Sequence, residues 1–269
     1  MNNSKIAFIG AGNMATSLIM GLVNKGATPS NIAATDIDSD KLSQLRTECG
    51  IRIGTLEEVV KSADVIVLAV KPQVMEQVCT TLKPLLSATG SVIISIAAGI
   101  PLHKFEAWLG SQQAIVRCMP NTPALVSEGA TGLFANAKTN ATQAALAETV
   151  LSAVGICSWL DSEDAINAVT ALSGSGPAYF FLMMEAMESA AVKMGLNAEM
   201  ARSFTIQTAL GAAKLAAASD VAPDELRRRV TSPGGTTEAA IKSFENEGFR
   251  ELVEHALSAA QKRSIELAD

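Results

Sequence analysis

Short apolar runs alternate with segments of helical spacing through the first 160 residues. Residues 64–70 form a continuous apolar run between polar breakers, which is typical of a strand buried on both faces. Similar runs lie at 5–10, 31–36, 91–98, 114–119 and 156–160, with a weaker one near 130–135, and helical spacing covers 13–25, 57–63, 72–86, a segment from Pro101, and 140–154. This alternation predicts an α/β fold with a mostly parallel, doubly wound sheet and helices on both faces.

The pattern changes after Asp161, where helical segments follow one another without a strand signal. They are expected at 163–172, 177–194, 198–218, 223–230, 236–247 and 249–267, so the boundary between domains 1–162 and 163–269 is placed after residue 162. The second and third of these segments are apolar almost all round, which indicates buried helices. A domain of this size does not cover both by itself, and a symmetric homodimer is the simplest way to cover them.

Composition supports a folded, lightly charged protein. Of 269 residues 48% are hydrophobic, which excludes disorder as the main state. The charged fraction of 18% is below the roughly 25% of ordinary soluble domains, which again favours surface hidden in an oligomer. The net charge of −6 argues against nucleic acid as a partner.

Several chemistries and locations are excluded or disfavoured. His103 and His255 stand alone, so a histidine-rich metal site is not expected and no metal is assigned. The four cysteines are far apart and form no CxxC, which favours reduced, mostly buried thiols over disulfides: Cys49, Cys79, Cys118 and Cys157. Neither a signal peptide nor a membrane span is recognisable, so a cytoplasmic location is expected.

A glycine-rich loop follows the first apolar run and opens the first helix. It matches GxGxxG/A, with the residues Gly10, Ala11, Gly12, Asn13, Met14 and Ala15. Gly10 permits the tight turn, Gly12 lets the backbone approach a pyrophosphate, and Ala15 allows close helix packing. Amides at the helix N-terminus would bind the phosphates. A turn without a ligand is the alternative.

The end of the second strand bears on the choice of cofactor. Asp36 lies there and is placed to accept hydrogen bonds from a ribose 2′-hydroxyl, which favours NAD. No arginine follows at once to hold a 2′-phosphate, although Ser39 and Lys41 are near.

Three further strand ends meet at the same edge of the predicted sheet, where such folds bind their ligands. These ends carry Ala69, Val70, Lys71 and Pro72, then Ala97, Ala98 and Gly99, and then Asn121 and Thr122 between two prolines. Neutral Asn and Thr side chains suit a nicotinamide carboxamide or a small polar substrate. A rigid turn remains the alternative for the third segment, and a solvated strand end remains the alternative for Lys71.

Two glycine-rich segments precede helices in the second half. In the first, residues 173–177, Ser175 or Gly176 would cap a helix that has Pro177 at its first position. In the second, residues 231–237, successive free amides would form an anion site with room for a carboxylate. Capping and close packing alone are the alternative for both. No histidine is obviously placed to donate a proton to a carbonyl, so hydride transfer to an imine fits better than alcohol chemistry.

Taken together, the segments IGAGNMA, LAVKPQ, SIAAG, RCMPNTP, VTALSGSGPAY and PDELRRRVTSPGGTTEAAIKSFE resemble the pyrroline-5-carboxylate reductase family over essentially the whole chain. The resemblance implies a Rossmann-type domain and an all-helical C-terminal dimerisation domain whose dimers often form a decamer. It implies reduction of 1-pyrroline-5-carboxylate to L-proline by NAD(P)H, the last step of proline biosynthesis.

The resemblance also implies roles for particular residues. The strand-end residues named above would bind the cofactor, and Ser175 would close the substrate pocket across the dimer. The segment Gly234, Gly235, Thr236 and Thr237 would bind the substrate, with amides on its carboxylate and the Thr237 hydroxyl on the ring nitrogen. The family commonly uses NADPH, so NADPH is predicted, with NADH usable, although Asp36 favours a free ribose hydroxyl.

Three alternatives remain at this stage. A 3-hydroxyacid dehydrogenase of the 6-phosphogluconate type shares the two-domain plan, but it should carry a lysine soon after the loop at 173–177, and none precedes Lys193. A broader imine reductase would use other cyclic imines. A non-catalytic nucleotide sensor would retain the fold without turnover.

Overall fold

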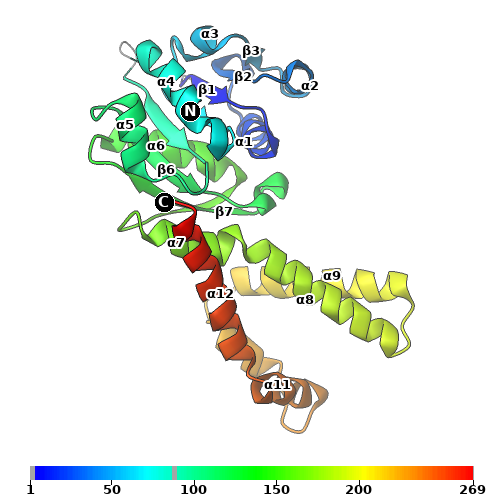
Figure 1. Cartoon of the computed structure of the whole chain (residues 1–269). Coiled ribbons are helices and arrows are strands. Elements are labelled where there is room, and N and C mark those ends of the chain that lie inside the picture. Colours follow the sequence, from blue (N-terminus) through cyan, green and yellow to red (C-terminus); the bar gives the residue numbers. More distant parts are fainter. Residues whose placement is uncertain (1–3, 87–89, 269) are drawn as a thin grey trace. The chain divides into compact units, whose positions relative to one another are not determined.

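The computed structural model describes residues 4–86 and 90–268 and divides the chain into two compact units (Figure 1). Unit 1 comprises the N-terminal part as far as Ser175 together with the last residues from Ala260. Unit 2 comprises Gly176–Ala259.

Unit 1 is built on one sheet with the strand order β3-β2-β1-β4-β5-β6-β7-β8. The strands are β1 (Ile6–Ile9), β2 (Ile32–Thr35), β3 (Arg52–Ile53), β4 (Val65–Leu68), β5 (Val92–Ser95), β6 (Ala114–Met119), β7 (Gly129–Ala135) and β8 (Gly155–Trp159). All neighbouring pairs are parallel except β6 and β7, which are antiparallel. The predicted mostly parallel sheet is therefore confirmed.

Helices cover both faces of this sheet. They are α1 (Asn13–Asn24), α2 (Ser39–Cys49), α3 (Leu56–Val60), α4 (Pro72–Leu86), α5 (Leu102–Leu109) and α6 (Ala141–Leu151). One buried cluster joins β1 with α1, α2 and α6 through residues such as Phe8, Leu18 and Val150. A second cluster joins the opposite face with α3, α4 and α5 through Met75, Leu82 and Phe105. The alternation of side chains along each strand supplies both faces.

The sequence-based prediction omitted α2 and β3. Helix α2 is mostly polar and buries only Leu42, Leu45 and Cys49. Both ends of the helix carry capping residues that are recognisable in a sequence. The Asp38 carboxylate accepts hydrogen bonds from two first-turn amides, and Gly50 adopts the left-handed conformation that often ends a helix. The helix was missed because hydrophobic periodicity, rather than capping, guided the prediction.

The four cysteines are free, and Cys157 alone of them is half-buried while the others are buried, as expected for reduced thiols. Burial raises the pKa of the Cys79 thiol to about 12 and also raises the pKa of the Cys118 thiol well above its usual range. These thiols are therefore protonated and unreactive at neutral pH.

Helices alone follow β8 in the described part of the chain. Helix α7 (Ala165–Val169) continues into a π-helical segment (Thr170–Gly174), and α8 (Gly176–Lys193) follows. Unit 2 adds α9 (Ala198–Ala217), α10 (Pro223–Arg229), α11 (Thr236–Asn246) and most of α12 (Phe249–Glu266). The predicted change to an all-helical region after residue 161 is confirmed.

The domain boundary was expected after residue 162, whereas the compact units divide after Ser175. The difference arises because α7 packs with β6 and β7 of unit 1. The end of α12 also returns to unit 1, where the Ser264 hydroxyl donates a 2.8 Å hydrogen bond to Asn167 Oδ1. The chain therefore crosses between the units twice, once at α8 and once within α12.

Unit 2 buries few of its own apolar side chains. Helix α8 buries only Gly176, α9 buries Ala201 and Thr205, and α10 and α11 bury none. Large hydrophobic side chains such as Phe180, Leu182 and Phe204 are more than half exposed. Among the residues that the structure describes, no helix is long and apolar enough to cross a membrane.

Candidate functional site: one edge of the sheet and the start of helix α11

Four parallel strands of unit 1, β1, β2, β4 and β5, end level with one another, because the register pairs Ile9 with Thr35 and Leu68, and Leu68 with Ser95. Strand β6 pairs Arg117 with Ser95 and continues two residues further, to Met119. The loops that carry the cofactor candidates follow these strand ends. The structure thus brings the strand ends to one edge, where doubly wound sheets bind their ligands.

Gly10 has φ of +105°, and a Cβ there would lie 2.5 Å from the Ala69 carbonyl oxygen. Only glycine fits this contact without a shift of the neighbouring strand. Gly12 lies in the open, with no atom within 4 Å of a Cβ built there, and it begins α1 without a side-chain cap. The first-turn amides of Asn13, Met14 and Ala15 therefore have neither an intrahelical acceptor nor a side-chain cap at Gly12.

Asp36 contacts this loop directly. One of its carboxylate oxygens accepts a 2.6 Å hydrogen bond from the Ala11 amide, and the other accepts a 2.9 Å bond from the Asp38 amide. The carboxylate therefore fixes the glycine-rich loop, a role that the sequence analysis did not foresee. It also leaves a negative charge at the place where a ribose would lie.

The remaining strand-end candidates differ in exposure. Ala97 is buried and its amide lies 3.3 Å from Ser95 Oγ, and Gly99 approaches the chain terminus, where a Cβ would lie 3.0 Å from the Leu267 carbonyl oxygen. Ala69 and Val70 are half-buried. The exposed candidates in unit 1 are Gly12, Asn13, Lys71, Pro72, Ala98 and Thr122.

Asn121 uses its side chain inside the protein. It is 8% exposed, its Oδ1 accepts a hydrogen bond from the Ala130 amide, and its Nδ2 donates to the Ser173 carbonyl oxygen. That carbonyl needs an outside donor because residue 177, its partner in an α-helix, is a proline without an N–H. The Asn121 side chain therefore also holds the π-helical segment, and its expected contact with a nicotinamide carboxamide stays a prediction.

Ser175 does not lie in a capping loop as predicted. Its backbone is helical and its amide donates to the Thr170 carbonyl oxygen, five residues back, in π-helical geometry. The glycines allow a close approach here, since a Cβ at Gly174 would lie 2.6 Å from Met119 Cε. Segment 173–177 therefore continues the helix beside the end of β6, and π-helical turns often accompany functional sites.

The second glycine-rich segment lies in unit 2. Gly235 precedes the first residue of α11 without a side-chain cap, as expected for an anion site. Two of the four expected amides are already engaged, however. Gly234 donates to Glu238 Oε2 at 2.7 Å and Gly235 donates to the Ser232 carbonyl oxygen at 3.0 Å. The first-turn amides of Thr236 and Thr237 have no intrahelical acceptor.

Glu238 carries the charge nearest to this helix start. The Gly234 amide, with Lys242 4 residues along the helix, lowers the pKa of its carboxyl. A carboxylate already sits beside the first turn of α11, which is where negative charge is favourable.

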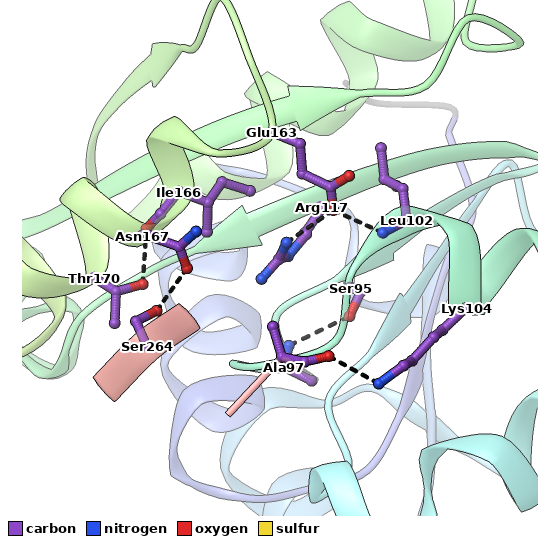
Figure 2. A network of polar contacts seen from close by, with 11 residues as sticks. Ser95, Ala97, Leu102, Lys104, Arg117, Glu163, Ile166, Asn167, Thr170 and Ser264 are labelled. Atoms are coloured by element: carbon purple, nitrogen blue, oxygen red, sulfur yellow. Dashed lines mark hydrogen bonds and ion pairs between the residues drawn. The ribbon is translucent and has the colours of Figure 1, made fainter. Parts of the chain in front are cut away.

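Arg117 and Glu163 were missed by the sequence analysis. They form a 2.8 Å ion pair between β6, which carries Arg117, and the segment before α7, which carries Glu163 (Figure 2). The available signal was a charged residue inside the otherwise apolar run 114–119. Its partner was not readable because it lies 46 residues further along the chain.

The strand-end residues fit a dinucleotide. The open backbone at Gly12, the tight turn at Gly10 and the uncapped start of α1 together provide donors and space for phosphates. Among the described residues, no group of three or more His, Cys, Asp and Glu side chains is placed to hold a metal ion.

Comparison with known protein families gives two matches, one in each half of the chain. The family described as pyrroline-5-carboxylate reductase dimerisation matches residues 163–267. The family described as NADP oxidoreductase, coenzyme F420-dependent, matches residues 5–99, which include the glycine-rich loop. The first match begins where the sequence analysis placed the second domain, but the boundary after residue 162 stays a prediction.

Several relatives that match over almost the whole chain are named pyrroline-5-carboxylate reductase. The chain is 56% identical to a pyrroline-5-carboxylate reductase of Pseudomonas aeruginosa, over 100% of this chain and 98% of the relative. A pyrroline-5-carboxylate reductase structure from Coxiella burnetii matches with a TM-score of 0.97 and 47% identity, and covers both chains fully. A Plasmodium falciparum pyrroline carboxylate reductase with NADP bound matches with a TM-score of 0.86 and 31% identity, again over both full chains. The chain belongs to the pyrroline-5-carboxylate reductase family.

Proposed function

We propose that this chain reduces 1-pyrroline-5-carboxylate to L-proline with NAD(P)H, the last step of proline biosynthesis. The observation that carries this function is full-length identity of 56% to a curated reductase of that name. Membership of this family decides against the 3-hydroxyacid dehydrogenase alternative.

The cofactor would be held by the unit 1 edge. We assign the phosphates to the amides of the loop from Gly10 to Ala15, and the rest of the nucleotide to the loops of Ala69–Pro72, Ala97–Gly99 and Asn121–Thr122. Reduced nicotinamide supplies a hydride, so the chain itself has to orient the substrate and stabilise its charge.

NADPH is the proposed cofactor, with NADH usable. A Plasmodium relative binds NADP, which supports this choice. The Asp36 carboxylate opposes a 2′-phosphate, but its two hydrogen bonds to backbone amides neutralise part of its effect. We therefore expect turnover with both cofactors.

The start of α11 is proposed to bind the substrate carboxylate. Because the Gly234 and Gly235 amides donate within the loop, the amides of Thr236 and Thr237 are the available donors. The two glycines then shape the backbone and leave space rather than donate. Ser175 of a second copy of the chain is proposed to line the same pocket, as the family resemblance implies.

The Thr237 hydroxyl is proposed to hydrogen-bond the ring nitrogen of the substrate. This contact would orient the imine carbon and stabilise the protonated form, which accepts a hydride readily. Thr237→Ala should lower kcat/KM about 10- to 100-fold, as expected for a hydrogen bond to a charged group. Thr237→Ser keeps the hydroxyl and should restore most of the activity. Equal kinetics for Thr237→Ala and the unaltered protein would remove the role.

The active molecule is proposed to be a homodimer in the cytoplasm, with assembly to a decamer as a further expectation. The match to a dimerisation family and the uncovered apolar side chains of unit 2 support self-association. An apolar surface hollow within unit 2 is lined by Met183, Met187, Ile241, Phe244, Phe249 and Val253. A partner helix would fill such a hollow.

The function is tested by oxidation of NADPH, and separately of NADH, with pyrroline-5-carboxylate as substrate. Rapid turnover with proline as product supports the proposal. Preference for another cyclic imine would favour the broader imine reductase. Cofactor binding by a folded protein without turnover would favour the nucleotide sensor.

A further inference from the structure

A buried arginine lies in β6, two residues before the strand ends at Met119. Arg117 is 4% exposed and pairs in register with Ser95, the last residue of β5. Its neighbours in the strand, Val116 and Cys118, are apolar and buried. Because arginine is seldom buried unless its charge is paired, the burial of Arg117 needs a structural explanation.

The partner of Arg117 ties three segments together. Glu163 Oε1 lies 2.8 Å from Arg117 Nη1 and also accepts a 2.7 Å hydrogen bond from the Leu102 amide (Figure 2). One carboxylate oxygen thus joins β6, the first residue of α5 and the segment that leads into α7. All three segments belong to unit 1.

The tied segments border the candidate cofactor loops. Leu102 follows the loop of Ala97–Gly99 by three residues, and Asn121 follows Arg117 by four. The same region includes the bond from Asn121 to Ser173 and the contact between Ser95 and Ala97. A shift of the ion pair would move both loops at once.

Stability alone does not explain the pair. Arg117 Nε is buried without a hydrogen-bond partner among the described residues, so the guanidinium is only partly satisfied. Replacing a buried ion pair with apolar side chains of similar size is often neutral or stabilising. Because Arg117 Nε is left without a partner in the described part of the chain, the ion pair is better explained by the way it positions the segments that it joins than by a gain in stability.

We propose that the Arg117–Glu163 pair is a positioning pair for the reductase reaction, holding the loops after β5 and β6 at the spacing that the reaction needs. Neither residue touches the reacting atoms, and both act through the loops that they anchor. The part of the proposal that concerns turnover rests on the proposed function.

Three variants test the pair. Arg117→Lys keeps the buried charge but loses the planar fork, Glu163→Gln keeps an oxygen that accepts from Leu102 but loses the charge, and Arg117→Met with Glu163→Leu removes both charges. Asn136→Ala is the matched control. Asn136 is also buried and also bonds β6 and α5, through Ile115 and Glu106, but at the opposite end of β6.

The kinetic prediction separates positioning from stability. Arg117→Lys and the double variant should fold and lose about 10- to 100-fold in kcat, the loss expected when reacting groups are displaced by about 1 Å. KM for either substrate should change much less. Asn136→Ala should lower the melting temperature without this loss of kcat. If the double variant does not fold, Arg117→Lys and Glu163→Gln decide the result.

Hydrogen exchange on the protein without cofactor gives a readout independent of activity. The amides of residues 97–100, of Leu102, and of Asn121 and Thr122 should exchange faster in the pair variants and not in Asn136→Ala. A folded pair variant with unaltered kcat, or with unaltered exchange in these loops, would overturn the proposal. If the unaltered protein shows no reductase turnover, the proposed function fails while the exchange comparison still reports on the pair.

Discussion

Unit 1 and unit 2 handle their apolar residues in opposite ways. Unit 1 buries them in two clusters, one on each face of the sheet. Unit 2 leaves side chains of α8 and α9 such as Phe180, Phe204 and Leu210 exposed. The contrast shows that unit 1 has a hydrophobic core of its own, whereas unit 2 exposes apolar side chains that a second protein surface could bury.

The polar groups repeat the contrast. At the edge of unit 1, Asp36, Asn121 and Glu163 each bind backbone atoms and fix loops before any ligand arrives. At the start of α11 in unit 2, the donors of Thr236 and Thr237 have no intrahelical acceptor. Unit 1 is therefore preorganised by its own side chains, and unit 2 is expected to acquire its final order with a second copy and a substrate.

The largest effect is expected from a charge placed on the uncovered surface of unit 2. Phe180→Glu should prevent the proposed homodimer from forming, leave a monomer or an aggregate, and lower turnover at least about 100-fold, because a buried unpaired charge costs roughly 3–5 kcal/mol. Size-exclusion chromatography with light scattering measures the assembly.

The matched control makes the same change in unit 1. Phe180 is 69% exposed and Ile156, on β8, is 71% exposed. Ile156→Glu should leave the assembly and turnover intact. Equal behaviour of the two variants would contradict the contrast between the units.

Gly10→Ala tests whether the unit 1 edge is as tightly built as its contacts indicate. The new methyl group would meet the Ala69 carbonyl and occupy a strained backbone, at a cost of about 1–3 kcal/mol. Affinity for NADPH, measured by fluorescence titration, should fall about 10-fold or more as the loop shifts.

Gly26→Ala is its control. Gly26 has φ of +88° but no atom within 4 Å of a new Cβ, and it lies beyond the end of α1. It should lose stability through strain alone and keep its cofactor affinity. A loss of affinity in both variants would mean that general destabilisation, rather than the loop, sets the affinity.

A smaller effect is expected at Asp36. Asp36→Asn keeps an oxygen that accepts from the Ala11 amide but removes the negative charge near the ribose. The ratio of kcat/KM for NADPH to that for NADH should rise about fivefold, which corresponds to roughly 1 kcal/mol for a solvent-accessible charge. Asp40→Asn, in the first turn of α2, should leave the ratio unchanged, and a similar rise there would remove the role of Asp36.

The smallest effect concerns thiol reactivity, which reports on the closed core of unit 1. Because burial raises the pKa of Cys79 to about 12, a thiol reagent at pH 8 should not label it in the folded protein. The half-buried Cys157 should react first. Mass spectrometry of briefly labelled protein identifies the site, and early labelling of Cys79 would contradict a rigid core.

Much of unit 1 was readable from the sequence because local patterns determine it. The run 64–70 contains β4 and the run 114–119 matches β6, and the GxGxxA loop lies between β1 and α1 as predicted. The mostly polar α2 lacks such a pattern and was missed. Helix positions in unit 2 were also readable, because their apolar spacing persists even where the residues are exposed in the single chain.

The hydrogen bonds and the ion pair between distant residues at the site could not be predicted from the sequence. The ligand contact of the Asn121 side chain stays a prediction, but the sequence did not indicate the hydrogen bond that this side chain donates to the Ser173 carbonyl oxygen, 52 residues away. Segment 173–177 was expected to be a loop because of its glycines, yet it is helical. Arg117 and Glu163 come together only in the folded chain, so the ion pair could not be predicted from either residue alone.

The most direct test of the account is the molar mass of the species that turns over pyrroline-5-carboxylate, measured by light scattering on fractions assayed with NADPH. The account predicts that activity travels with a species of at least two chains, each of 28.0 kDa. Activity that travels with a single chain would show that unit 2 needs no second copy, and would contradict the central comparison.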